Sequence, residues 1–91
     1  TYYSPSSSVR NTLIADGCVI AGEVDNSIIF RGVHVGRGCR IRNSIIMNNT
    51  VCGENVSLTS VISDKYATIR SDITLAGAET RPFYIPKNKI I

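Results

Sequence analysis

The 91-residue chain contains no tryptophan, and only 7% of its residues are aromatic. Aliphatic side chains must therefore form the hydrophobic core, as a narrow fold would require. No apolar run approaches the roughly 18 residues that a membrane span needs, and no export signal is recognisable. The chain also starts without a methionine, so we interpret it as a single-domain fragment of a longer protein.

The sequence also lacks the short motifs that mark common active sites. Gly-x-Ser-x-Gly, His-Glu-x-x-His, a phosphate-cradling Gly-Lys-Ser/Thr and an obvious carboxylate pair are all absent. The three cysteines, Cys18, Cys39 and Cys52, do not have the spacing of metal ligands. We therefore expect no catalytic residue, no metal and no cofactor in this chain. Since such cysteines behave as small buried apolar residues, we expect free thiols, which suit a reducing cytoplasm.

What the sequence does contain is a repeat. Its four copies are spaced 15, 17 and 16 residues apart and each ends on two aliphatic residues: Asn11-Thr12-Leu13-Ile14, Asn26-Ser27-Ile28-Ile29, Asn43-Ser44-Ile45-Ile46 and Thr59-Ser60-Val61-Ile62. Internal repetition at a short period is the sequence signature of a solenoid, in which each unit packs only against its neighbours.

The spacing of apolar residues within the repeat indicates which solenoid. Within each unit these residues fall about six apart, in three runs: Ile14 and Ile20, then Ile29, Val35 and Ile41, then Ile46, Cys52 and Leu58. The residue four positions after such a residue is again small or apolar, as at Cys18, Val24, Cys39, Ile45, Val56 and Ile62. Neither a helical period nor strict alternation gives this spacing. The sequence predicts an all-β fold, a left-handed parallel β-helix of the hexapeptide-repeat type with about four coils. The step from Ile41 to Ile46 is one residue short, which leaves the inward register there open by one.

The pattern divides the chain into three segments. Residues 1–8 are expected to be a linker from a missing N-terminal domain, residues 9–75 the β-helix, and residues 76–91 a C-terminal capping segment. Within the last segment, Phe83-Tyr84-Ile85 and Lys89-Ile90-Ile91 are predicted to be two short strands. A terminal piece that departs from the repeat is expected because the open edge of the last coil must be covered.

One stretch of the sequence concentrates positive charge. The chain carries a net charge of only +3, but residues 31–42 hold four arginines and no acid: Arg31, Arg37, Arg40 and Arg42. Arginine binds phosphate groups bidentately, so these residues are candidates for an anion or effector site. Alternatively, they are solvated and point along different corners of the solenoid. The modest charge and the absence of interleaved aromatic residues argue against nucleic-acid binding.

His34 is the only histidine and lies between two valines, so it is predicted to point outward from a strand. Many hexapeptide-repeat proteins are acyltransferases in which a histidine acts as general base beside a coenzyme A groove between subunits. A general base needs an orienting partner and a neighbouring substrate site, and the chain lacks the usual protruding loop. A hexapeptide-repeat acyltransferase using a coenzyme A thioester is the alternative function.

Several stretches of the chain resemble the C-terminal domain of bacterial glucose-1-phosphate adenylyltransferases, the ADP-glucose pyrophosphorylases. The resemblance covers about residues 9–70 and is carried by residues 11–20, 22–33, 35–39, 43–47 and 63–65. The ending, Pro82-Phe83-Tyr84-Ile85 followed by Lys87 and Ile90-Ile91, is more similar to the regulatory GlgD-type subunit of glycogen biosynthesis than to the catalytic subunit.

This resemblance implies a role in ADP-glucose synthesis for glycogen. In the family, an N-terminal nucleotidyltransferase domain joins glucose 1-phosphate to ATP, and no part of this chain matches its nucleotide loop or metal-binding acids. The chain would then be a non-catalytic structural and regulatory domain that supports subunit assembly and allosteric control. Its partners would be its own N-terminal domain, a catalytic subunit or a second copy, and a sugar-phosphate effector, with no nucleic acid and no membrane. No family motif assigns the effector contacts, for which the candidates are Arg31, Arg37, Arg40 and Arg42.

A third interpretation shares the same two-domain plan. The chain would be the β-helix of a related sugar nucleotidyltransferase or of a translation-factor subunit, and only the preceding sequence separates this from the adenylyltransferase interpretation.

Overall fold

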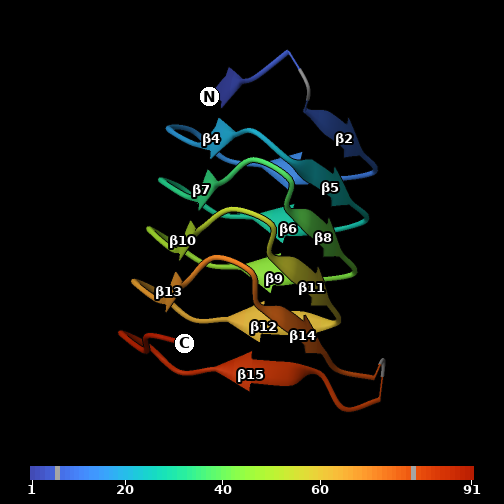
Figure 1. Ribbon diagram of the computed structural model, residues 1–91, viewed down its shortest axis with the longest axis vertical. Coiled ribbons are helices and arrows are strands. Elements are labelled where there is room, and N and C mark those ends of the chain that lie inside the picture. The colour runs from blue at the N-terminus through green and yellow to red at the C-terminus, as the bar shows by residue number, and fades with distance from the viewer. Residues whose placement is uncertain (6, 79) are drawn as a thin grey trace.

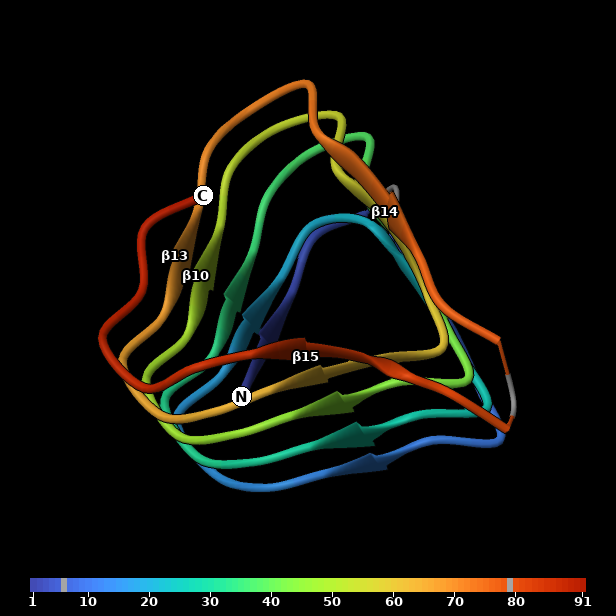
Figure 2. The same ribbon diagram turned by 90° about the horizontal axis from the view of Figure 1, so that it is seen from below.

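The computed structural model describes residues 1–5, 7–78 and 80–91, whose strands form three parallel sheets around a triangular left-handed β-helix (Figures 1 and 2). Sheet A contains β1 (Tyr2–Tyr3), β4 (Val19–Ile20), β7 (His34–Val35), β10 (Val51–Cys52) and β13 (Thr68–Ile69). Sheet B contains β2 (Ser8–Arg10), β5 (Glu23–Asp25), β8 (Arg40–Arg42), β11 (Ser57–Thr59) and β14 (Thr74–Ala76). Sheet C contains β3 (Leu13–Ile14), β6 (Ile28–Ile29), β9 (Ile45–Ile46), β12 (Val61–Ser63) and β15 (Phe83–Ile85).

Each coil contributes one strand to each sheet, so coil 1 runs from β1 to β3 and coil 5 from β13 to β15. The predicted all-β parallel β-helix is confirmed. Within the described residues, no helix is long and apolar enough to cross a membrane. The structure extends the expected four coils at both ends, because β1 and β15 continue the pairing of the repeat.

The core consists of columns of equivalent side chains, because in-register parallel pairing places each residue over its counterpart in the next coil. Ile20, Val35, Cys52 and Ile69 form the column of sheet A, and all four are buried. Cys18 and Cys39 are also buried, and all three thiols are free, as predicted. Burial raises the pKa of the Cys39 and Cys52 thiols, so both are held as neutral, unreactive groups.

The structure settles the register that the sequence left open in sheet C. Ile46 is fully buried, whereas Ile45 is only half-buried on the outer side of the sheet. Ile62 pairs with Ile45 and is likewise outside, so of the two registers that the sequence left open, the one with Ile46 inside is correct. The fourth repeat begins one residue later than expected, at Ser60, and a shift of one residue moves every side chain of a strand to the opposite face.

Residues in the left-handed region of φ turn the chain at the corners between sheets. Glycine and asparagine tolerate this conformation best, which explains why they recur in the repeat. The corner between sheets B and C uses Asn11, Asn26, Asn43 and Ser60. The corner between sheets C and A uses Gly17, Gly32, Asn49, Tyr66 and Asn88. The corner between sheets A and B, hereafter the A–B corner, uses Gly38, Asn55 and Asp72.

Both ends of the chain add to the β-helix. Tyr2 and Tyr3 pair with β4, although they belong to the segment expected to be a linker. Their backbone forms hydrogen bonds with groups of β4 that would otherwise lie unpaired at the edge of sheet A. The two C-terminal strands do not pair with each other: β15 joins sheet C, and Ile90 forms a bridge to Thr68 of sheet A. The division of the chain into domains at residues 8 and 75 stays a prediction.

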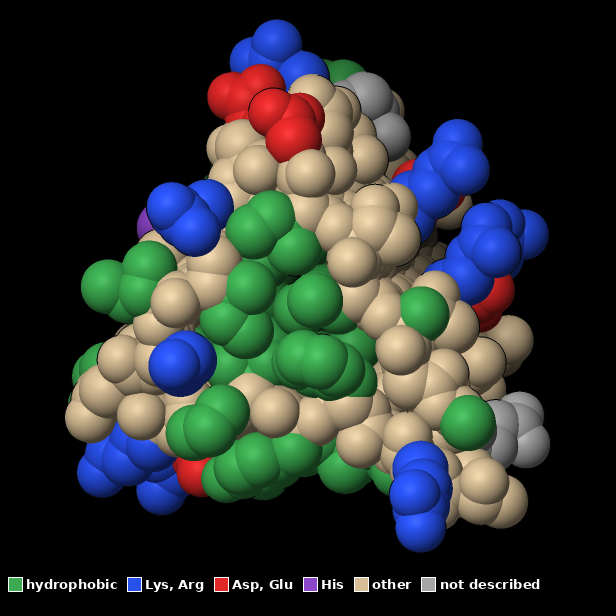
Figure 3. Space-filling view, turned by 60° about the horizontal axis from the view of Figure 1, so that its bottom comes forward, with side chains coloured by type: hydrophobic (Ala, Val, Ile, Leu, Met, Phe, Trp, Pro, Cys, Tyr) green, Lys and Arg blue, Asp and Glu red, His purple; other side chains and the backbone are tan. Residues whose placement is uncertain are grey.

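Apolar side chains gather at the C-terminal end of the solenoid, at the centre of the face that Figure 3 shows. Ile73, Leu75 and Ile91 pack against the core here and are only partly buried. Ile69 is fully buried above them.

Candidate effector site and interaction surface

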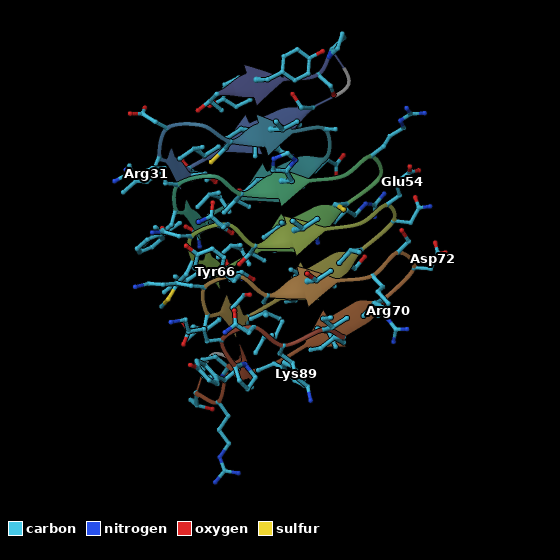
Figure 4. The ribbon with its side chains drawn as sticks, turned by 90° about the vertical axis from the view of Figure 1, so that its left-hand side faces the viewer. Arg31, Glu54, Tyr66, Arg70, Asp72 and Lys89 are labelled. Carbon is cyan, nitrogen blue, oxygen red and sulfur yellow. The ribbon has the colours of Figure 1, made fainter. Side chains whose placement is uncertain are left out.

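The four arginines proposed as effector contacts occupy two separate regions of the β-helix. Arg40 and Arg42 project from β8 on the outer face of sheet B, and Arg37 lies just before them in the A–B corner of coil 3. Arg31 lies in the corner between sheets C and A, on the opposite side of sheet A from Glu54 and Asp72 (Figure 4). The structure therefore brings Arg37, Arg40 and Arg42 into one neighbourhood and leaves Arg31 outside it.

Acidic side chains one coil earlier face the arginines of β8. The register pairs Glu23 with Arg40 and Asp25 with Arg42. The Glu23 carboxylate oxygen Oε2 lies 3.5 Å from Nε of Arg40, and both side chains are more than half exposed. Such exposed ion pairs contribute only roughly 0–1 kcal/mol. These acids lie 17 residues before their partners, so a search for acids within residues 31–42 could not find them.

Coil 2 is shorter than its neighbours at the A–B corner. Two residues, Ala21 and Gly22, connect β4 to β5, whereas residues 36–39, 53–56 and 70–73 make the same connection in coils 3, 4 and 5. In Figure 2 the corner of coil 2 is set back from those later corners. Gly22 is buried under the next coil, and a Cβ atom on it would lie only 2.7 Å from the carbonyl oxygen of Cys39.

The short corner leaves a hollow on the surface, hereafter the coil-2 notch. Its volume is about 330 Å³, and residues 21–23 and 37–40 line it. Two arginines, Arg37 and Arg40, and one acid, Glu23, belong to this lining. The spacing of 15 rather than 17 residues between the first two repeats was the sequence signal for the missing residues, but the spacing alone did not reveal a hollow.

A second surface feature was not foreseen from the sequence: the outer face of sheet C is apolar. Consecutive aliphatic pairs on β6 and β9 place one side chain inside and one outside, as in sheets covered on both faces. The outward residues stack in register as Leu13, Ile28, Ile45, Ile62 and Tyr84, hereafter the sheet C ladder. Leu13 is 72% exposed, and a hollow of about 320 Å³ lies beside it, lined by residues 13–15 and 28–30. Contiguous exposed apolar surface of this kind marks interaction sites.

His34 lies on the outer face of sheet A, where the register places it between Val19 and Val51. Its side chain is exposed, as predicted. In the part of the chain that the structure describes, the imidazole makes no hydrogen bond that would orient it as a general base. The acyltransferase alternative therefore gains no support from the geometry around His34.

Comparison with known proteins agrees with the fold. The model of the GlmU-like C-terminal hexapeptide family matches residues 3–81. The chain is 35% identical over 81 residues to glucose-1-phosphate adenylyltransferase of Acetivibrio thermocellus, which is 89% of this chain and 19% of that protein. It is 44% identical over 90 residues to the glycogen biosynthesis protein GlgD of Bacillus subtilis, which is 99% of this chain and 26% of that protein. The chain thus spans about a fifth to a quarter of the length of these relatives.

Proposed function

Since the chain belongs to the GlmU-like C-terminal hexapeptide family, we propose that it is the non-catalytic β-helix domain of a glucose-1-phosphate adenylyltransferase or of a GlgD-type subunit. Its similarity to both kinds of protein over most of its length supports this proposal. In this role the chain contributes no turnover of its own. It supports the assembly and the allosteric control of a protein that makes ADP-glucose for glycogen in the cytoplasm.

The observation that carries the assembly role is the sheet C ladder. Exposed side chains such as Leu13 and Ile28 are unfavourable in water, and burying them against another apolar surface would release about 25 cal/mol for each Å² covered. The relatives are several times longer than this chain, which supports a nucleotidyltransferase domain of the same polypeptide as the partner of this face. A catalytic subunit or a second copy is the partner at the remaining surfaces.

The regulatory role would use the arginines. The proximity of Arg37, Arg40 and Arg42 supports a shared sugar-phosphate effector site around the A–B corner. Arg31 lies at a different corner, so any effector contact that it makes would belong to a separate site.

The proposal is tested by the size of the native protein in source cells, measured by immunoblot with an antibody raised against this chain. A band several times heavier than 9.9 kDa is expected, and the N-terminal sequence of that protein should contain a nucleotidyltransferase domain. A band at the size of the chain itself would contradict the proposal. Saturable binding of acetyl coenzyme A would then become the next measurement.

A further inference from the structure

The A–B corners are linked from coil to coil by one recurring backbone hydrogen bond. The N–H of Asn55 donates to the carbonyl of Arg37 at 2.9 Å, and the N–H of Asp72 donates to the carbonyl of Glu54 at 2.9 Å. Both donors are left-handed residues, and each points to the preceding coil. Gly38 holds the equivalent position in coil 3, with a φ of 76°.

The N–H of Gly38 has no such partner. The carbonyl that should accept its hydrogen bond would belong to the two residues that coil 2 lacks. Across the described residues, no acceptor takes the N–H of either Gly38 or Arg37. By analogy with Asn55 and Asp72, the Gly38 N–H is directed toward coil 2, which places a free donor in the coil-2 notch.

Backbone and side chains in the notch have the same preference for a negative charge. A turn in which a left-handed residue follows one of ordinary φ exposes successive N–H groups and forms an anion-binding concavity. Arg37 and Arg40 line the same hollow. Among the described residues Arg37 has no ion-pair partner, and Arg40 makes only its exposed contact with Glu23. The lining therefore holds two positive charges, one negative charge and an unpaired donor.

We propose that the coil-2 notch binds the phosphate group of a small phosphorylated ligand. The Gly38 N–H and the guanidinium groups of Arg37 and Arg40 are the donors, because arginine forks match the oxygens of a phosphate. A volume of about 330 Å³ admits a ligand the size of a sugar phosphate. The regulatory meaning of this site rests on the proposed function, whereas the binding itself does not.

The test is a titration of the ¹⁵N-labelled chain with inorganic phosphate at constant ionic strength, followed by NMR. The Gly38 amide resonance is expected to shift saturably. Arg37→Ala and Arg40→Ala together are expected to weaken binding by about tenfold or more, since each removes a charged donor. Arg31→Ala is the matched control, because it removes the same charge at another corner, and its affinity should stay within about twofold of the original.

A second variant fills the coil-2 notch and keeps both of its arginines. Inserting Ser-Asn between Ala21 and Gly22 gives coil 2 a corner of the usual length and supplies the missing carbonyl while both arginines remain. This insertion is expected to abolish the saturable shift of Gly38. The proposal is overturned if the amide resonance of Gly38 does not shift in the original chain, or if Arg31→Ala weakens phosphate binding as much as Arg37→Ala does. Either result would count whatever size the immunoblot gives for the native protein.

Two further titrations identify the source of the phosphate group. A hexose phosphate and a nucleoside monophosphate are added in turn to the original chain. Tighter binding of either than of inorganic phosphate, with the same dependence on Arg37, supports the proposal and names the ligand class. Binding of either that does not depend on Arg37 counts against it.

Discussion

The hydroxyl of Tyr84 donates a hydrogen bond of 2.5 Å to the Oδ2 atom of Asp64 and so joins β15 to the turn that follows β12. The other carboxylate oxygen of Asp64 accepts from the N–H of Lys65 at 2.7 Å. These two bonds, the Tyr84 bond first, lower the pKa of Asp64. The same contact raises the pKa of the Tyr84 hydroxyl. The pair lies at the C-terminal end of the sheet C ladder.

Replacing Tyr84 with phenylalanine should therefore destabilise the fold by an amount that depends on pH. The lowered pKa of Asp64 means that the bond stabilises the fold above the ordinary carboxyl pKa and ceases to do so as the pH falls through the folded value. The raised pKa of Tyr84 means that this stabilisation is lost again as the pH rises through its folded value. The difference in melting temperature between the two proteins should be largest near neutral pH and should shrink toward both extremes. A difference that is constant between acid and neutral pH would contradict this account.

Tyr66 should be replaceable with a gain in stability. Its φ of 59° lies in the left-handed region, where the equivalent residues of other coils are glycine or asparagine. This conformation destabilises the folded state by roughly 1–3 kcal/mol when the side chain is larger than that of asparagine. Because Tyr66 is 54% exposed, its packing offsets little of this cost. Tyr66→Asn is expected to raise the free energy of unfolding by about 1 kcal/mol in urea denaturation. Tyr2→Asn, at a 59% exposed tyrosine of ordinary φ, should bring no gain.

The register of sheet C can be checked with two adjacent isoleucines. Ile46 is fully buried and Ile45 lies half-buried outside, so Ile46→Ala should cost about 2–5 kcal/mol and Ile45→Ala only about 1 kcal/mol. Urea denaturation of the two variants measures both values. The reverse order would mean that the strand has the register with Ile45 inside.

The sheet C ladder should be sensitive to charge in the assembled protein. Ile28→Lys places an ammonium group in the proposed interface with the nucleotidyltransferase domain, and it is expected to loosen the packing of the two domains, measured as cleavage between them that is about tenfold or more faster in limited proteolysis of the full-length protein. Val51→Lys is the matched control, because Val51 on sheet A is 42% exposed and Ile28 is 41% exposed. Equal effects of the two variants would place the interface somewhere other than sheet C.

The fold was accessible from the sequence because the solenoid repeats its local pattern. Each strand pairs with its equivalent in the next coil, so the six-residue spacing of Ile29, Val35 and Ile41 indicates both where the strands lie and which residues form the core. The sequence did not show that the fourth repeat begins at Ser60 and not at Thr59, because Val61 and Ile62 are adjacent apolar residues and composition does not show which of them points inward. Similarity to the adenylyltransferase family was likewise visible in the sequence and agrees with the relatives found.

The candidate site was accessible only in part. The arginines between residues 31 and 42 stand out by their charge, but their separation into two regions depends on which turn or strand each one occupies. The acids that face Arg40 and Arg42 come from the previous coil. The N–H of Gly38 is unpaired because coil 2 lacks two residues at its A–B corner. Features that arise between coils cannot be read from any single repeat.

The short corner of coil 2 also has a consequence for how such a domain can change in evolution. Although two residues are missing between β4 and β5, all three strands of coil 2 remain in register with those of coil 3. Corners can therefore gain or lose residues one coil at a time while the columns of the core stay aligned. A β-helix can in this way acquire or lose a surface cavity by changing the length of a single turn.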